Sequence, residues 1–186
     1  MPEFAAKLAR MGRHVALLRA VNVGGRKLPM AELRALCGEI GWADAATYIA
    51  SGNVVFTAPG RREAIEAQLE QAIARRFGMD VPTVVRSAEE WRGYAPACPF
   101  PDAARDAPNR LLLYLSKRPP APGADTAIQA KAADGERVAL AGDALWIHFP
   151  EGSGRSRLSP SLIDRLVGSP ATSRNHNSVL KLEEML

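Results

Sequence analysis

The chain of 186 residues presents the same order of secondary-structure signals twice. Each half begins with an apolar, strand-like run and continues with a helix, two short strands around a tight turn, a second helix, a last strand and a short helix. This order is typical of the split βαβ, or ferredoxin-like, arrangement. The sequence therefore predicts an α+β protein with two tandem ferredoxin-like (βαββαβ) subdomains, each a two-layer α/β sandwich with a mainly antiparallel sheet.

The first half gives these signals in full. Pro29 suits the first turn of a helix, and Ser87 with Glu90 forms a capping-box signature. The hairpin turn is Ser51-Gly52-Asn53, and a glycine loop over 23–27 precedes the first helix. The predicted strands are 14–22, 47–50, 54–57 and 81–86, and the predicted helices are 29–40, 61–77 and 88–94.

The second half repeats the pattern after a proline-rich stretch. Ala141-Gly142-Asp143 corresponds to the first hairpin turn, and Ser159-Pro160 opens a helix. Segment 169–175 matches segment 81–87 at a constant offset of 88, because each has a Pro, then an Arg, then a capping residue. This match favours an internal duplication, although hairpin glycines and N-caps also recur by chance. The predicted strands are 111–115, 136–140, 144–149 and 171–174, and the predicted helices are 125–133, 160–167 and 177–186.

These signals predict four parts of the chain. Residues 1–13 form an N-terminal extension, 14–95 the first ferredoxin-like subdomain, 96–108 a Pro-rich linker, and 109–186 the second subdomain with its C-terminal helix. No run of about 18 apolar residues is present, so we expect no membrane span. Cys37 and Cys98 lie far apart, which indicates reduced thiols and a cytoplasmic protein.

Positive charge is concentrated at the amino end. Residues 1–35 carry seven basic and two acidic side chains, while the whole protein has a net charge of +4. Basic surfaces attract phosphate-bearing partners, although basic side chains also serve simply to solvate a surface. The charge pattern therefore allows nucleic acid or a phosphorylated small molecule as a partner and does not choose between them.

Polar and basic residues gather at two predicted loops of the first half. In a ferredoxin-like sheet the first and third strands are antiparallel, so the loop after the first strand lies beside the hairpin that enters the third. Backbone amides of glycines, side-chain amides and cations are the groups that bind anions. The glycines alternatively serve only tight turns. The candidate ligand-binding residues here are Arg19, Asn22, Gly24, Gly25, Arg26, Lys27, Ser51, Gly52 and Asn53.

The same reasoning gives a second candidate cluster in the second half. At one end of the second sheet, the first predicted strand begins and the third and fourth end. This brings together Arg110, the loop 152–157 and the end of the strand 171–174. Such a loop is able to close over a phosphate, and it is equally an ordinary solvated linker. The candidate ligand-binding residues here are Arg155, Arg157, Arg174 and Asn175.

Four ordered segments resemble the bacterial family known as domain of unknown function 1697. They are ALLRAVNVGG at 16–25, MAELRAL at 30–36, YIASGNVVF at 48–56 and ATSRNHNSVLKL at 171–182. The resemblance implies a small cytoplasmic α+β protein with two related subdomains, and it implies no activity. The family's closing motif has an aromatic residue and a Thr where this chain has His176 and Ser178.

The sequence leaves three classes of function open. The first is a binding module for nucleic acid or another phosphate-bearing ligand, the second an enzyme acting on a small anionic substrate, and the third a protein-interaction module without a ligand site. No catalytic residue is identified. The glycine patterns of P-loops and dinucleotide folds are missing, so no cofactor is predicted. His14, His148 and His176 lack acidic neighbours at metal-ligand spacing, so no metal is predicted either.

Overall fold

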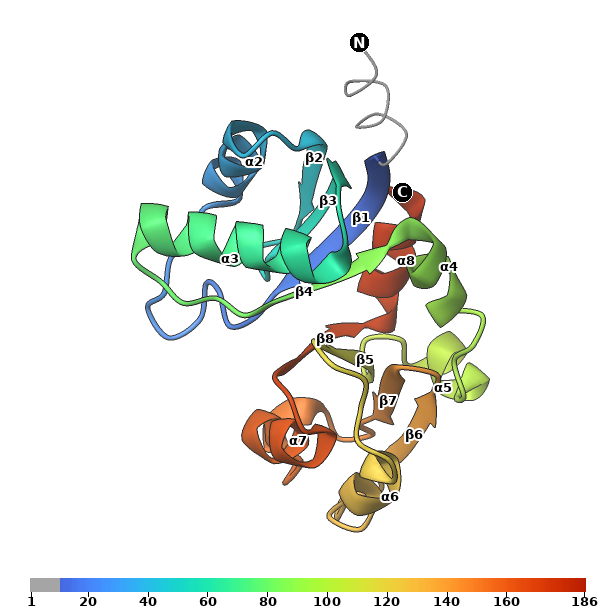
Figure 1. Ribbon diagram of the computed structural model, residues 1–186. Helices are drawn as coiled ribbons and strands as arrows, with labels where there is room; N and C mark the ends of the chain where they lie inside the picture. The colour runs from blue at the N-terminus through green and yellow to red at the C-terminus, as the bar shows by residue number, and fades with distance from the viewer. Residues whose placement is uncertain (1–10) are drawn as a thin grey trace. The chain divides into compact units, whose positions relative to one another are not determined.

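The computed structural model describes residues 11–186, which divide into two compact units, 11–91 with 182–186 and 92–181. Each unit is built on one four-stranded antiparallel sheet (Figure 1). Seven α-helices and one 3-10 turn lie within the described residues. The predicted α+β class is therefore confirmed. Residues 1–10, most of the predicted N-terminal extension, lie outside the described residues, and residues 11–13 belong to the first strand.

The first unit follows the predicted order of elements. Its strands lie in the order β2-β3-β1-β4, and all neighbours are antiparallel. The elements are β1 (Met11–Leu18), α2 (Met30–Glu39), β2 (Ala43–Tyr48), β3 (Asn53–Pro59), α3 (Arg62–Phe77), β4 (Thr83–Ser87) and α4 (Ala88–Tyr94), the last of which ends in the second unit.

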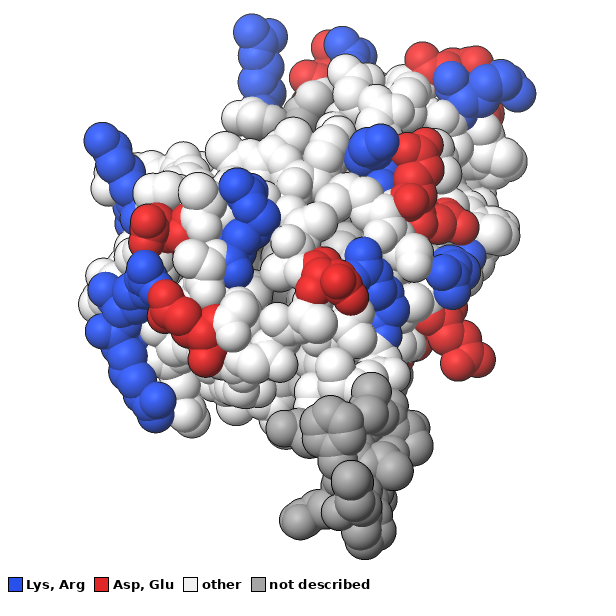
Figure 2. All heavy atoms as spheres, turned by 90° about the horizontal axis from the view of Figure 1, so that it is seen from above, with Lys and Arg blue, Asp and Glu red and all other residues white. Residues whose placement is uncertain are grey.

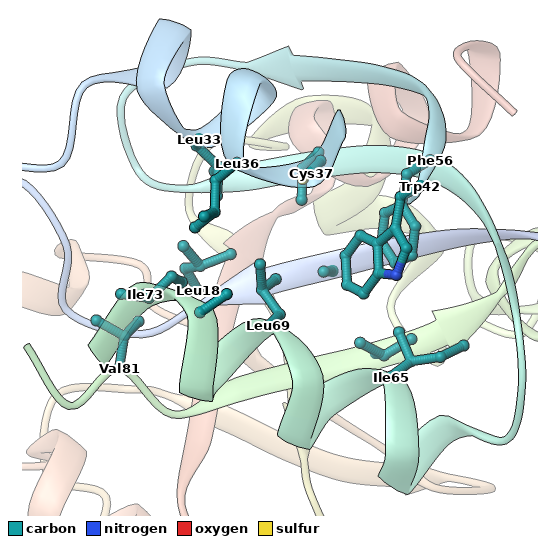
Figure 3. Packing of buried hydrophobic residues seen from close by; sticks show 14 of the residues in the cluster. Leu18, Leu33, Leu36, Cys37, Trp42, Phe56, Ile65, Leu69, Ile73 and Val81 are labelled. Atoms are coloured by element: carbon teal, nitrogen blue, oxygen red, sulfur yellow. The ribbon is translucent and has the colours of Figure 1, made fainter. Parts of the chain in front are cut away.

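The core of the first unit lies between its sheet and the helices α2 and α3, which cover one face (Figure 3). Leu33, Leu36 and Cys37 come from α2, and residues at four-residue steps, such as Ile65 and Leu69, come from α3. Trp42 stacks on Phe56 of β3 with ring centroids 4.0 Å apart. The Trp42 indole N–H donates to Gln68 Oε1 at 3.1 Å. Gly78 ends α3 in the left-handed conformation, which glycine adopts without strain.

The second unit has the same strand arrangement, β6-β7-β5-β8. Its helices α6 and α7 pack on one face, where Ile128, Ile163 and Val167 meet Leu145 and Ile147 of β7. The elements are α5 (Pro101–Asp106), β5 (Leu111–Ser116), α6 (Ala124–Gln129), β6 (Arg137–Ala141), β7 (Ala144–His148), a 3-10 turn (Ser153–Arg155), α7 (Pro160–Val167), β8 (Ala171–Asn175) and α8 (His176–Glu184), which ends in the first unit.

The outer edge of β4 is closed by carboxylates. The backbone N–H groups of Thr83 and Val85 donate to Glu70 Oε1 at 2.7 Å and to Glu66 Oε1 at 2.9 Å, both from α3. In the second unit the N–H of Ala171 in β8 donates to Asp164 of α7 at 2.9 Å. Since unpaired edge strands invite pairing with other chains, these side chains protect β4 and the start of β8.

Two predicted helix ends are confirmed in detail. The Ser87 N–H donates to Glu90 Oε2 at 2.8 Å and the Glu90 N–H to Ser87 Oγ at 3.2 Å, which is a complete capping box. Ser159 caps α7 by accepting from the Leu162 N–H.

Several predicted boundaries are wrong. The first strand ends at Leu18 and not at residue 22, because Ala20 and Asn22 adopt positive φ angles of 52° and 55° that no strand accommodates. The second strand runs from Ala43 to Tyr48 and contains a bulge, and residues 49 and 50 belong to the turn. The stretch 96–108, expected to be a Pro-rich linker, contains a helix that the sequence did not predict, α5, with Pro101 in its first turn.

The helix predicted over 125–133 is also shorter in the structure, because α6 ends at Gln129. Glu136 Oε2 accepts from the N–H groups of Ala133 and Asp134 at 3.1 and 2.8 Å, which holds those residues in a turn. Within the described residues, no helix has the length and apolar character needed to cross a membrane.

Candidate functional site

The two loops predicted to meet in the first half do lie side by side. The Leu18 N–H donates to Gly52 O at 2.8 Å, and the Asn22 side chain donates to Ala50 O at 2.7 Å. Between the segments lies an open groove of about 500 Å³, a volume in the range of small-molecule sites. The groove is lined by Asn22, Gly25, Arg26, Lys27, Leu28, Pro29, Met30 and Ala50.

Asn22 holds the two walls of the groove together. Its Nδ2 donates to Leu28 O at 2.9 Å as well as to Ala50 O, and its Oδ1 accepts from the Leu28 N–H at 2.9 Å. Both amide hydrogens are therefore donated within the protein. The side chain tethers one loop to the other. Asn22, a candidate ligand-binding residue from the sequence, therefore has a structural role here.

Arg26 and Lys27 supply the positive charge of the groove. Arg26 is half-buried, and its Nη2 donates to Asp80 O at 2.6 Å just after the end of α3. Lys27 is exposed. Both cations line the groove next to the start of α2, where Pro29 is the N-cap and gives no side-chain hydrogen bond. Together with the first amides of α2, they make this end of the groove favourable for an anion.

Gly24 and Gly25 have positive φ angles of 57° and 82°, so the turn itself favours glycine at both positions. A Cβ atom at either position would meet no atom within 4 Å. The backbone is thus open to solvent here, as the anion-site hypothesis requires, while the backbone angles alone already account for the residue type. Arg19 follows the strand, and its N–H donates to Pro82 O at 3.0 Å.

Gly52 and Asn53 lie inside the protein. Asn53 is fully buried, and its Nδ2 donates to Tyr48 O at 2.8 Å and to Ser51 Oγ at 3.0 Å. Gly52 packs so tightly that an added Cβ would lie 2.6 Å from Val21 Cγ2. These residues shape the turn that carries Ala50, while Ser51 is the exposed member of the predicted trio.

Sequence reasoning missed the apolar part of this site. Leu28, Pro29, Met30 and Ala50 line the groove, and none of them was a candidate. Ile49, next to Ala50, has a positive φ of 49°, which is rare for a β-branched residue. The signal available in the sequence was an isoleucine at the start of a tight turn, a position that favours Gly, Asn or Asp.

The second candidate cluster is arranged differently. Leu112 of β5 pairs with Asn175, and Leu111 pairs with His148, so the predicted ends of three strands do meet. Arg110 Nη1 donates to Pro150 O, while Arg155 and Arg157 are exposed. Asn175 Oδ1 accepts from the Ser178 N–H at 2.9 Å and so caps α8.

Arg174 is buried at 7% exposure, and its Nη1 donates to Thr172 Oγ1 at 3.0 Å and to Ser173 O at 2.7 Å. Burial lowers the pKa of Arg174 to about 10. The guanidinium donates these bonds to residues of its own strand, so they stabilise the strand and do not indicate a ligand.

The hollow beside Arg155 is acidic. It has a volume of about 220 Å³, and Asp134, Glu136 and Glu151 line it. Burial raises the pKa of Glu136, but hydrogen bonds from Ser156 and from the backbone of Asp134 and Ala133 outweigh this effect, so its pKa is lowered. The carboxylate is therefore charged at neutral pH, and an anion is less favoured here than in the groove of the first unit.

The histidines do not form a metal centre. No group of three or more His, Cys, Asp or Glu side chains within residues 11–186 is arranged to hold a metal ion. Burial is the largest cause of a lowered pKa at His14, His148 and His176. All three are therefore mainly neutral at physiological pH.

Comparison with known proteins gives a family and a fold. The solved structure of the conserved bacterial protein SP0830 from Streptococcus pneumoniae is similar over 94% of this chain and 98% of that chain, with 24% sequence identity and a TM-score of 0.70. At this identity the similarity shows the fold alone. No curated protein matches the chain. The family model described as a protein of unknown function (DUF1697) matches residues 11–146, more than half of the chain, and the resemblance seen in the motifs is thereby confirmed: the chain belongs to the DUF1697 family.

Proposed function

We propose that the groove of the first unit binds a small phosphate-bearing ligand. The observation that carries this proposal is the presence of Arg26 and Lys27 on one groove whose two walls Asn22 ties together. A preformed site with two cations attracts an anion without first ordering its own loops. The uncapped start of α2 beside these cations adds to the attraction.

A small ligand fits better than a nucleic acid. Binding a polyanion requires a row of available cations, since each phosphate contact adds its own salt-dependent term. Several arginines of the described residues are instead paired with carboxylates: Arg76 with Glu32 and Glu39, Arg62 with Glu90, Arg105 with Asp106, and Arg137 with Asp102. On the face shown in Figure 2, basic and acidic side chains are interspersed.

Binding fits the groove better than catalysis. Among the residues that line it, the charged side chains are Arg26 and Lys27, and none is a carboxylate or an imidazole, the side chains that most often act as general acids and bases. No lining residue is a Ser, Cys or His. The groove therefore favours a binding module over an enzyme acting on a small anionic substrate.

We also propose that each unit is a ferredoxin-like subdomain and that the two arose by duplication, with the subdomain limits 14–95 and 109–186 expected from the sequence. The identical strand orders and the carboxylate caps on β4 and β8 support this proposal. A cytoplasmic location is proposed as well, because Cys37 and Cys98 are both free thiols.

The proposed function is tested by calorimetric titration of inorganic pyrophosphate into the full chain at low and moderate salt. We expect binding that weakens as salt rises, and a loss of about tenfold or more in affinity for the double variant Arg26→Ala/Lys27→Ala, since the two charge contacts are lost. The matched control is Arg61→Ala, which removes an exposed arginine at the start of α3, about 24 Å along that helix from the end near Asp80.

Equal pyrophosphate affinity for wild type and the double variant would contradict the proposal. A single-stranded oligonucleotide is titrated in parallel. If the protein binds the oligonucleotide tightly and does not bind pyrophosphate, the nucleic-acid alternative is favoured instead.

A further inference from the structure

The groove has an apolar wall as well as a charged end. Leu28 is fully buried behind it, Met30 is half-buried and Pro29 is exposed, and Ala50 faces them from the turn between β2 and β3. Phosphate alone makes no use of such a wall. A ligand that fills the groove therefore needs an apolar part joined to its anionic part.

Two exposed apolar residues are sequence neighbours of residues that line the groove. Val23 is 57% exposed and lies next to Asn22, and Ile49 is 51% exposed and lies next to Ala50. Single exposed apolar residues are ordinary on protein surfaces. These two do not line the groove themselves, but each adjoins a residue that does, Asn22 on one segment and Ala50 on the other.

Ile49 also holds an unfavourable backbone conformation. Its φ of 49° lies in the left-handed region, where side chains branched at Cβ are strongly disfavoured and where Gly or Asn fits without strain. Because half of the side chain is exposed, core packing does not explain why an isoleucine occupies this turn. Strained residues that packing does not require are found preferentially at ligand sites.

We infer that the ligand is a nucleotide, with its phosphates at Arg26 and Lys27 and its base against the apolar wall and Ile49. This inference rests on the proposed function. A planar base has apolar faces that suit Pro29 and Met30, and a groove of about 500 Å³ lies in the size range of sites for molecules of this kind. Inorganic phosphates and sugar phosphates offer no comparable surface and leave the apolar wall in contact with water.

The experiment compares ADP with inorganic pyrophosphate on the same protein, each by calorimetric titration at one salt concentration. We expect ADP to bind wild type about tenfold or more tightly than pyrophosphate, because contact of the base with the apolar wall adds to the same phosphate contacts. The variant Ile49→Asn removes the apolar side chain and suits the left-handed backbone, so it folds. It lowers the ADP affinity several-fold and leaves the pyrophosphate affinity unchanged.

The control variant Leu180→Asn removes another exposed apolar side chain, one on α8 with no sequence neighbour that lines the groove, and leaves both affinities unchanged. Equal affinity of wild type for ADP and pyrophosphate would overturn the inference while the proposed function stands. An Ile49→Asn variant that binds ADP as wild type does would also overturn the role of Ile49. Failure of wild type to bind either molecule would refute the inference and the proposed function together.

Discussion

Arg86 of β4 and Arg174 of β8 occupy the same position in the two sheets. Arg86 lies opposite Val15 in β1, and Arg174 lies opposite Leu113 in β5. Each is buried, at 1% and 7% exposure, and each donates from Nη1 to the carbonyl of the preceding residue, at 2.8 and 2.7 Å. Burying a guanidinium is unfavourable unless hydrogen bonds compensate, so its appearance at one register in both units is what the proposed duplication leads us to expect.

The carboxylate that closes the β4 edge predicts a stability effect. Glu66→Ala leaves the buried N–H of Val85 without this acceptor, so we expect the free energy of unfolding to fall by about 1–3 kcal/mol. Urea denaturation measures the change. Glu66→Gln, which keeps an acceptor oxygen, is expected to lose less. The control is Glu63→Ala, an exposed position on the same helix, and an equally large loss there would contradict this account.

A matched pair of variants distinguishes the exposed Gly24 from the buried Gly52. Gly24→Ala and Gly52→Ala both place a side chain at positive φ, a strain of about 1–2 kcal/mol. Only in Gly52→Ala does the new Cβ collide with Val21 and Leu18, at 2.6 and 2.8 Å, which adds about 1–3 kcal/mol of overpacking. Thermal unfolding compares the two. Equal losses would show that the turn at Gly52 is looser than the structure has it.

Asn53 is expected to matter for stability and not for a ligand. Asn53→Ala removes two donated hydrogen bonds of a buried side chain and leaves the half-buried carbonyl of Tyr48 without this partner, so we expect a loss of about 1–3 kcal/mol. Ser51→Ala removes an exposed hydroxyl and is expected to lose less. Denaturant unfolding tests stability, and a pyrophosphate titration tests binding. A folded Asn53→Ala protein with normal stability and weakened binding would reverse this assignment.

Much of the fold could be predicted because its signals are local. The apolar residues of α3 recur within one helix, and the capping box of Ser87 and Glu90 lies within four residues. The end of β1 could not be predicted, because the positive φ angles of Ala20 and Asn22 that end it belong to a loop whose Asn22 side chain bonds to Ala50, a residue far along the chain. The helix α5 was not predicted, because it is short and lies in a proline-rich stretch that is typical of a linker.

Which residues of the two hairpin turns correspond also depends on how the strands pair, which the local sequence does not show. Tyr48 pairs with Asn53 around a four-residue turn, whereas Ala141 pairs with Ala144 around two residues. The strand registers place Gly52 at the position of Asp143, so the expected match of Gly52 with Gly142 is wrong by one residue. For the site, the sequence identified the cations but not the apolar wall, because Leu28, Pro29 and Met30 line a groove only where their segment meets the turn that carries Ala50.

The burial of His14 predicts that the stability of the protein decreases at acidic pH. Burial lowers its pKa, and the Ala58 backbone and the Glu90 charge oppose this shift without cancelling it. As pH falls below about 6.5, the unfolded chain takes up a proton that the folded state resists, so stability decreases. Urea denaturation at pH 8 and pH 5.5 measures the loss. His14→Phe is expected to reduce it, with a remainder from His148 and His176, and an unchanged pH dependence in this variant would contradict the assignment.

The two thiols should react at different rates in the native protein. Cys37 is fully buried in the core beneath α2, and burial raises the pKa of its thiol to about 12. Cys98 is half-buried, and burial raises the pKa of its thiol as well. Since the thiolate is the reactive form, a disulfide reagent should label Cys98 slowly and Cys37 only after unfolding. In denaturant both should react quickly, and Cys98→Ser should remove the native phase. A native Cys98→Ser protein that is still labelled at the rate of Cys98 would show that Cys37 is accessible and that α2 packs differently on the sheet.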